Sequence, residues 1–201
     1  MSSDRRHIRA EIRARRRELE FTEPDHHARQ SAELCRRAYA SIIVARARRL
    51  AAFLSSHGEV DLVPLLARLL AIGKQVYVPQ IDGPRLHFAP LFDGVGLRVH
   101  RFGIPEPDLP RGRCCPALAL DVVLAPLVAF DATGNRIGMG GGYYDRTFAF
   151  LQRRRVKRKP LLLGIAFEFQ RVARIGTEPW DIPLDGIITE RGVQLCKSAG
   201  H

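Results

Sequence analysis

DVVLAPLVAFDATGNRIGMGGGYYDR, residues 121–146, is the stretch that decides the fold of this chain. Its first ten residues are almost continuously apolar, which is typical of a strand buried on both faces of a parallel sheet. Residues 134–146 then contain five glycines, two tyrosines and two arginines, a mixture that suits neither a core strand nor a core helix. Because ligands in open α/β sheets bind beyond the carboxyl ends of the strands, we expect residues 134–146 to form a binding loop.

Strands and helices are predicted to alternate on either side of this stretch. Apolar runs predict further strands at residues 48–55, 74–80, 160–167 and 185–189, and Pro79 is expected to end the second of them. Helical spacing of apolar residues predicts helices at residues 5–19, 22–40, 61–73 and 144–154, with Thr22 as the N-cap of the second. The alternation predicts an α/β fold, with one three-layer domain over residues 1–201. We expect a largely parallel central sheet flanked by helices, with the glycine-rich loop at the carboxyl end of a strand.

The composition is that of a globular protein. Hydrophobic residues make up 46% of the 201 residues, enough for a sizeable core. The four cysteines form neither a CxxC pair nor a cluster with zinc spacing, so we expect no disulfide framework and a reduced, cytoplasmic setting. The arginine-rich N-terminal segment lacks the apolar core of a signal peptide, and the apolar runs are too short to span a bilayer. No membrane association is therefore expected.

Positive charge is concentrated in two segments of the chain. The net charge is +11; residues 1–49 carry thirteen arginines against seven acids, and residues 153–159 (RRRVKRK) carry six basic side chains. Such segments attract phosphates, nucleic acid or polyanionic small molecules, although a solvated surface explains residues 153–159 equally well. A nucleic-acid-binding protein is therefore an alternative, but no helix-turn-helix, zinc-finger or RNP pattern supports a nucleic-acid partner.

The glycine-rich segment has the chemistry of a phosphate site. Glycines permit positive φ and let backbone N–H groups approach a ligand, and the helix that follows would present its positive N-terminal end. The segment matches neither the P-loop pattern GxxxxGK[ST] nor the dinucleotide pattern GxGxxG. A loop whose glycines merely satisfy tight turns is the simpler alternative. However, Arg136 and the paired tyrosines provide long polar side chains that a turn does not require.

GNRIGMGGGYYDR resembles the signature of the 5-formyltetrahydrofolate cyclo-ligase family, also called methenyltetrahydrofolate synthetase, whose core reads [RK]-[LI]-G-x-G-x-G-[YF]-Y-D. Other blocks, among them LAAFLSSHGEVD, GKQVYVP, FGIPEP and WDIPLDGIITE, have counterparts in that family in the same order. The resemblance implies an ATP- and magnesium-dependent ring closure of 5-formyltetrahydrofolate to 5,10-methenyltetrahydrofolate, with release of ADP and phosphate. Another ATP-dependent enzyme on the same scaffold is the second alternative, because fold does not fix function.

The resemblance also assigns roles to residues of this sequence. Arg136 and Tyr143 are implied as catalytic residues, and Asp145 and Asp181 as magnesium ligands. The residues implied for ATP are Arg5, Arg9, Arg136, Ile137, Gly138, Met139, Gly140, Gly141, Gly142, Tyr143 and Tyr144. Those implied for the folate substrate are Leu54, Glu59, Phe102, Met139, Gly140, Gly141, Gly142 and Tyr143.

Simpler explanations compete with some of these roles. Helix capping explains Asp145 equally well, and a solvated arginine stripe is the alternative for Arg5 and Arg9. Met139 replaces a commoner residue of the family signature, which bears on substrate fit more than on reaction type. Because a polyglutamylated folate is a polyanion, we also expect arginines near the cleft to favour substrates with longer glutamate tails.

Overall fold

The computed structural model describes residues 3–100, 103–153 and 159–196. Phe102 and most of the basic segment 153–159 lie outside the described residues. Within them, no helix is long and apolar enough to cross a membrane.

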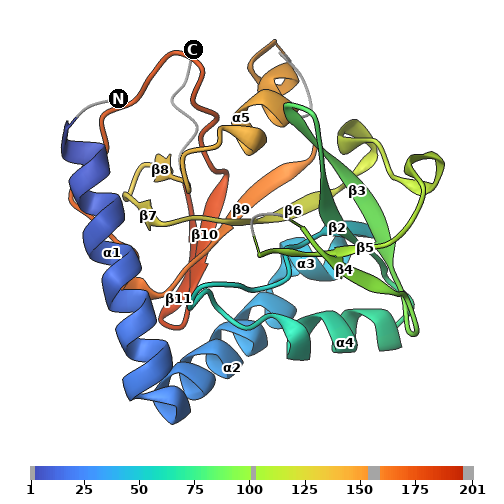
Figure 1. The fold of residues 1–201 in the computed structure, drawn as a ribbon, viewed down its shortest axis with the longest axis horizontal. Helices are drawn as coiled ribbons and strands as arrows, with labels where there is room; N and C mark the ends of the chain where they lie inside the picture. The colour runs from blue at the N-terminus through green and yellow to red at the C-terminus, as the bar shows by residue number, and fades with distance from the viewer. Residues whose placement is uncertain (1–2, 101–102, 154–158, 197–201) are drawn as a thin grey trace.

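A seven-stranded sheet forms the centre of the molecule, with the strand order β11-β10-β9-β6-β1-β2-β3 (Figure 1). Its strands are β1 (Arg49–Ala51), β2 (Gln75–Asp82), β3 (Arg85–Leu91), β6 (Val122–Pro126), β9 (Leu161–Ile165), β10 (Gly186–Thr189) and β11 (Gly192–Leu195). The neighbours from β10 to β2 pair in parallel, and only the outer strands β3 and β11 pair antiparallel. The predicted α/β fold with a largely parallel sheet is therefore confirmed.

Helices cover both faces of this sheet. On one face lie α2 (Pro24–Ala40), α3 (Ile42–Arg46) and α4 (Val63–Ala71), and on the other lie α5 (Tyr143–Phe148) and a 3-10 helix at Ala149–Arg153. Successive strand residues alternate between the two layers: Leu50 and Val122 pack toward α2 and α4, whereas Ala51 and Val123 pack toward α5. Strands buried on both faces read as continuous apolar runs, which is why the sequence predicted them.

The first helix, α1 (Ser3–Thr22), lies along one side of the molecule (Figure 1). Its Ile12 packs against Ala129 and Ile137, which belong to a small hairpin of β7 (Ala129–Phe130) and β8 (Arg136–Ile137). A second two-stranded ribbon pairs β4 (Leu97–Val99) with β5 (Pro105–Pro107). Further 3-10 turns lie at Arg111–Arg113, Ala117–Ala119 and Glu168–Gln170.

The strand predicted over residues 121–130 is wrong beyond Pro126. The backbone carbonyls of Leu127 and Val128 accept hydrogen bonds from the buried Gln170 side chain (3.1 and 2.8 Å), so the chain leaves the sheet there and turns into the β7–β8 hairpin. The glycine-rich segment therefore begins within this hairpin and does not follow the sheet strand directly, although it still lies beyond the carboxyl end of β6.

Four smaller sequence predictions are also corrected. Pro79 does not end β2, because β1 accompanies β2 only as far as Tyr77 and a proline is tolerated where a strand has one free edge. Thr22 is not an N-cap; its hydroxyl donates to the Glu18 carbonyl in the last turn of α1, and Glu23 precedes α2. The strand at 48–55 shortens to β1, and the helix at 144–154 begins one residue earlier and becomes 3-10 at Ala149.

Asp121 joins the starts of two neighbouring parallel strands. Its Oδ2 accepts hydrogen bonds from the N–H groups of Arg48 and Arg49 (2.9 and 3.0 Å), and its Oδ1 accepts one from Lys159 Nζ (2.8 Å). Burial acts to raise the pKa of Asp121, but Lys159 and the two N–H donors outweigh it and lower the pKa to about 2. The ionised carboxylate therefore stabilises the fold above its ordinary pKa of 3.8, and that contribution is lost as the pH falls toward 2.

Asp121→Asn should consequently reduce the free energy of unfolding at pH 7 by about 1–2 kcal/mol, a value discounted for partial exposure. Urea unfolding of both proteins between pH 7 and pH 2 measures this. The difference should shrink as the pH falls through the acidic range, because the wild-type carboxylate then becomes protonated. The exposed Asp93→Asn serves as the control, and a difference that stayed constant with pH would contradict the assignment.

Candidate functional site

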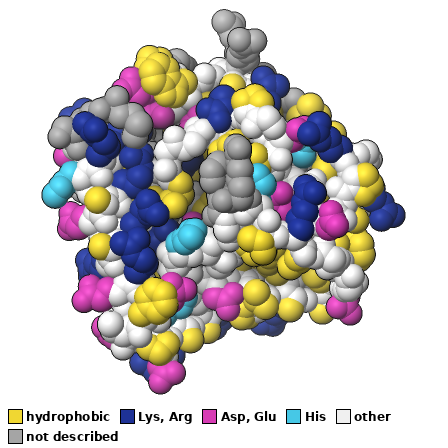
Figure 2. Space-filling view, viewed as in Figure 1, with side chains coloured by type: hydrophobic (Ala, Val, Ile, Leu, Met, Phe, Trp, Pro, Cys, Tyr) yellow, Lys and Arg dark blue, Asp and Glu magenta, His cyan; other side chains and the backbone are white. Residues whose placement is uncertain are grey.

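A cavity of about 850 Å³ opens between α1, the glycine-rich segment and the β2–β3 hairpin. Figure 2 shows Lys and Arg side chains gathered over the N-terminal half of α1 on one side of this face. Phe102 is not among the described residues. All the other residues that the sequence assigned to ATP, folate or magnesium line this cavity: Arg5, Arg9, Leu54, Glu59, Arg136, Ile137, Gly138, Met139, Gly140, Gly141, Gly142, Tyr143, Tyr144, Asp145 and Asp181. Segments separated by more than a hundred residues thus meet at one place.

Helix α1 presents a row of arginines to this cavity. Arg5, Arg9 and Arg13 are spaced by four residues and therefore share one face of the helix. Arg9 Nε donates to the Gly138 carbonyl (2.9 Å), which ties the helix to the glycine-rich segment. Burial, followed by repulsion from Arg5 and Arg13, lowers the pKa of Arg9. A polyanion in the cavity would relieve this repulsion.

The glycine-rich segment exposes its backbone to the same space. Gly140 has φ 105°, and a Cβ placed there would meet only Arg9 Cζ, at 3.9 Å; a Cβ on Gly138 would meet nothing within 4 Å. Gly142 has φ 64° and precedes α5, and a Cβ there would collide with Arg146 Nη1 at 2.6 Å. These glycines therefore leave the backbone open toward the cavity and allow Arg146 to close over it.

The two tyrosines at the start of α5 have different surroundings. Arg146 Cζ lies 5.2 Å from the centre of the Tyr143 ring, which lines the cavity beside the glycines. Tyr144 stacks on Phe148 at 6.1 Å between ring centres, and burial, followed by the charge of Glu59, raises its pKa. Tyr143 is consequently the better placed of the two to offer a hydroxyl to a ligand, and Tyr144 contributes mainly to packing.

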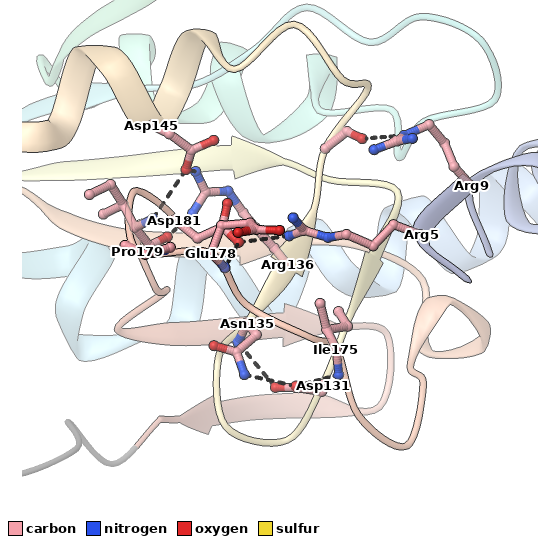
Figure 3. A network of polar contacts seen from close by, with 12 residues as sticks. Arg5, Arg9, Asp131, Asn135, Arg136, Asp145, Ile175, Glu178, Pro179 and Asp181 are labelled. Atoms are coloured by element: carbon pink, nitrogen blue, oxygen red, sulfur yellow. Dashed lines mark hydrogen bonds and ion pairs between the residues drawn. The ribbon is translucent and has the colours of Figure 1, made fainter. Parts of the chain in front are cut away.

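Two arginine–carboxylate pairs lie side by side at one end of the cavity (Figure 3). Arg136 Nη2 is 2.6 Å from Asp145 Oδ1, and Arg5 Nη2 is 2.8 Å from Asp181 Oδ2. Arg136 also donates to the Ile182 carbonyl, and the Ile182 N–H donates to Asp145 (3.2 Å). The helix-capping alternative for Asp145 is therefore wrong, since its carboxylate binds Arg136 and Ile182 and not the first turn of α5.

Glu59 lies in the loop after β1, where it faces the cavity beside Leu54. The Ser56 N–H donates to its Oε2 (3.2 Å), and Arg16 Nη1 is 3.6 Å from its Oε1. The side chains of Arg16 and Glu59 are 1% and 11% exposed, so this ion pair is buried between α1 and the loop after β1. Burial raises the pKa of Glu59, and the Arg16 charge opposes the shift.

Comparisons with known proteins identify the family of this chain. A sequence model described as the 5-formyltetrahydrofolate cyclo-ligase family matches residues 1–190. The chain belongs to this family. The 5-formyltetrahydrofolate cyclo-ligase of Escherichia coli K12 is 38% identical over 181 residues, covering 89% of this chain and 96% of that protein. That of Haemophilus influenzae is 35% identical over 187 residues, covering 92% and 96%.

A solved structure agrees with the fold of this cyclo-ligase family member. The NMR structure of Aquifex aeolicus 5,10-methenyltetrahydrofolate synthetase superposes with a TM-score of 0.82 at 28% identity and covers 98% of this chain and 95% of that one. The resemblance inferred from the glycine-rich signature is therefore confirmed.

Sequence reasoning missed one wall of the cyclo-ligase cavity. Pro79 and Ile81 on β2 and Leu86 on β3 form it, together with Ile104 and Glu106 beside them. The dipeptide Gly83-Pro84, a turn signal, forms the two-residue loop between β2 and β3 and could have revealed the hairpin that brings these residues together. The other residues of the lining that the sequence left without a site role are Arg13, Phe53, Ser56, His57, Pro126, Leu127, Arg146, Ala149, Gln152 and Trp180.

Glu59→Gln tests the assignment of that carboxylate to the folate. The substitution should raise the KM for 5-formyltetrahydrofolate about tenfold and leave the KM for ATP unchanged, because a charged acceptor in the cavity is lost. Since the pKa of Glu59 is raised, the wild-type KM should also increase as the pH falls through that raised value, whereas the variant should show no such increase. Glu33→Gln, on the exposed face of α2, is the matched control, and an unchanged KM in the Glu59 variant would contradict the role.

Proposed function

We propose that this protein catalyses the ATP-dependent closure of 5-formyltetrahydrofolate to 5,10-methenyltetrahydrofolate, with release of ADP and phosphate. The observation that carries the proposal is the cavity. Its lining combines arginine side chains and exposed glycine backbone with an apolar wall, in a chain that belongs to the cyclo-ligase family. Its volume of about 850 Å³ lies near the upper end for ligand pockets, which suits two substrates bound together.

The reaction needs positioning and charge neutralisation more than a protein nucleophile. The formyl oxygen attacks the γ-phosphorus, the bond to the β–γ bridging oxygen breaks, and ADP leaves. N10 of the folate then bonds to the formyl carbon and loses its proton, the C–O bond breaks, and phosphate carries away the formyl oxygen. Holding the formyl oxygen against the γ-phosphate is therefore the main task of the cavity.

The arginines are suited to the phosphate half of this chemistry. Arg9, Arg13 and Arg146 line the cavity with no carboxylate partner in the described part of the chain, so their charge is available to a triphosphate. The N–H groups around Gly138 and Gly140 would add hydrogen bonds to phosphate oxygens. Tyr143 and Leu54 would contact the folate rings, with Glu59 as an acceptor for pterin N–H groups. We assign the basic face of α1 to this role and not to nucleic acid, because its side chains reach the cavity.

Magnesium fits this site only as a metal bound largely by the nucleotide. No group of three or more His, Cys, Asp or Glu side chains within the described residues could hold a metal. Asp145 and Asp181 each use one oxygen for an arginine, which leaves the other, Oδ2 and Oδ1, for a cation. Mg²⁺ commonly takes one or two carboxylates and completes its shell with phosphate oxygens and water. Bound there, it would neutralise charge on the transferred phosphoryl group.

The proposal also covers the setting of the reaction. Cys35, Cys114, Cys115 and Cys196 carry free thiols, which agrees with the cytoplasmic location that we propose.

We further propose that arginines at the cavity mouth favour polyglutamylated substrates. Equal KM values for monoglutamate and polyglutamate forms would contradict that preference.

A spectrophotometric assay tests the proposed function. Purified protein is mixed with 5-formyltetrahydrofolate and magnesium-ATP, and the near-ultraviolet absorbance of methenyltetrahydrofolate is followed. The band should grow only when ATP is present, and ADP should appear in equal amount. Folded protein that binds ATP but produces no band would contradict the assigned substrate.

A further inference from the structure

The cavity contains a second buried carboxylate that the preceding assignments leave without a role. Glu106 lies on β5, lines the cavity and has a side chain that is 1% exposed. The strand that carries it is fixed from the neighbouring sheet, because Gln80 Nε2 donates to the Pro107 carbonyl (2.8 Å). The backbone beside Glu106 is thus held against β2.

The two oxygens of Glu106 differ in their contacts. Oε1 accepts a hydrogen bond from the Ile81 N–H (2.9 Å), whereas Oε2 is buried and receives no hydrogen bond from any described residue. Among the described residues, the cation paired with Oε2 is Arg98, whose Nη2 lies 4.0 Å away; Arg98 is 56% exposed and also lies 3.6 Å from Asp108. At 4.0 Å this contact is too long for a hydrogen bond, so Oε2 is a buried acceptor without a donor among the described residues.

Such an acceptor is costly in these surroundings. Ile81, Leu86 and Ile104 form the neighbouring lining, and a carboxylate oxygen buried among apolar side chains loses its hydration without compensation. Glu59 does not share this condition, since Ser56 and Arg16 contact its two oxygens. Within the cavity, Glu106 is therefore the carboxylate whose hydrogen bonding a ligand would complete.

We propose that Glu106 binds the pterin ring of the folate through Oε2 and determines the recognition of that ring. The donor would be an N–H or amino group of the pyrimidinone edge of the pterin, the part of 5-formyltetrahydrofolate that is flat, rich in N–H donors and suited to an apolar wall with one acceptor. ATP carries its charge on phosphates, which a carboxylate repels. The inference rests on the proposed function and adds a specificity-determining residue to it.

Glu106→Gln separates this role from a structural one. The glutamine oxygen can still accept a hydrogen bond from the Ile81 N–H. Its amide NH2 group then occupies the place of Oε2 and faces the N–H or amino group of the pterin, so that two hydrogen-bond donors oppose each other. Because Oε2 accepts no hydrogen bond from the described residues, the substitution removes only the long contact with Arg98. We therefore expect the variant to melt at or above the wild-type temperature and to bind 5-formyltetrahydrofolate about 10- to 100-fold more weakly.

The experiment measures binding of 5-formyltetrahydrofolate by titration calorimetry in the presence of a non-hydrolysable ATP analogue, and binding of that analogue alone. The affinity for the analogue should not change. Arg98→Ala is the matched control, which removes the long ion pair and should leave both affinities unchanged. If Glu106→Gln does not fold, Glu106→Asp, which withdraws the carboxylate by one methylene, should still bind folate about tenfold more weakly.

The outcomes distinguish a failure of the proposed function from a failure of the role assigned to Glu106. Wild-type protein that binds no 5-formyltetrahydrofolate overturns the proposed function and this inference together. Wild-type protein that binds it, with a folded Glu106 variant that binds it equally well, overturns the role of Glu106 alone. The same follows if Arg98→Ala weakens folate binding as much as Glu106→Gln, or if Glu106→Gln melts lower and binds both ligands more weakly.

Discussion

Arg136→Ala is expected to lower kcat by about 10²- to 10³-fold, the range seen when one preorganised donor to a developing charge is removed. Arg136 is the buried first residue of β8 and lines the cavity with the glycines that follow it. Its guanidinium is held on two sides, by Asp145 Oδ1 at 2.6 Å and by the Ile182 carbonyl. A cation fixed in this way before the substrates bind needs little reorganisation when charge shifts onto the transferred phosphoryl group.

The same contacts give Arg136→Ala a structural cost that must be separated from its catalytic effect. Loss of the guanidinium leaves Asp145 without its cation, which destabilises a largely buried site by about 3 kcal/mol. Arg136→Lys keeps the charge but cannot bind Asp145 and Ile182 together, so it should recover part of the stability and only a small part of kcat.

The measurement combines steady-state kinetics with thermal unfolding. Arg171→Ala is the matched control, because Arg171 pairs with Glu168 and lies over the Phe130 ring without lining the cavity. The control should lose stability and keep kcat. A folded Arg136→Ala protein with the wild-type kcat would show that this arginine serves the fold and not the phosphoryl transfer.

The sequence predicted the sheet where burial on both faces produced continuous apolar runs, as in β6 and β9. It did not predict that β6 ends at Pro126, because the cause is the Gln170 side chain, more than forty residues away in sequence. Strand β3 was missed for a similar reason: its mixed residues acquire their pattern only by pairing with β2. That the whole chain forms one domain stays a prediction.

The residues of the candidate site likewise divide into those that the sequence predicted and those that it did not. The glycine-rich segment and its flanking residues could be predicted because their chemistry lies within thirteen consecutive positions. Glu106 could not, since it reaches the cavity only through the packing of β5 against distant segments. The helical spacing of Arg13 and Arg16 from Arg9 places them on the same side of α1, but the burial of Arg16 against Glu59 depends on contact between that helix and the loop after β1.

Gly58→Ala is the second substitution with a large expected effect, because it acts where α1 meets the loop that carries Glu59. Gly58 has φ 71°, and a Cβ there would lie 2.7 Å from the backbone oxygen of Arg16 and 2.9 Å from its carbonyl carbon. Backbone atoms cannot rotate away, so either the helix or the loop must move. Strain at positive φ costs about 1–3 kcal/mol, and overpacking adds about 1–3 kcal/mol.

Comparison with Gly73→Ala separates the cost of overpacking from the cost of backbone strain. Gly73 follows α4 with φ 75°, almost the same backbone conformation, but a Cβ there meets nothing within 4 Å. Both alanine variants should therefore bear the strain, and only Gly58→Ala should bear the collision. Urea unfolding should place Gly58→Ala below Gly73→Ala by about 1–3 kcal/mol.

The collision should also reach the substrate site. Displacing α1 from the loop separates Arg16 from Glu59, whose oxygens now lie 3.6 Å from that cation and 3.2 Å from the Ser56 N–H. Gly58→Ala should therefore raise the KM for 5-formyltetrahydrofolate, whereas Gly73→Ala should leave it unchanged. Equal stability and equal KM in the two variants would mean that the close approach of α1 at Gly58 does not hold Glu59 in place, and that the helix serves the cavity through its arginines alone.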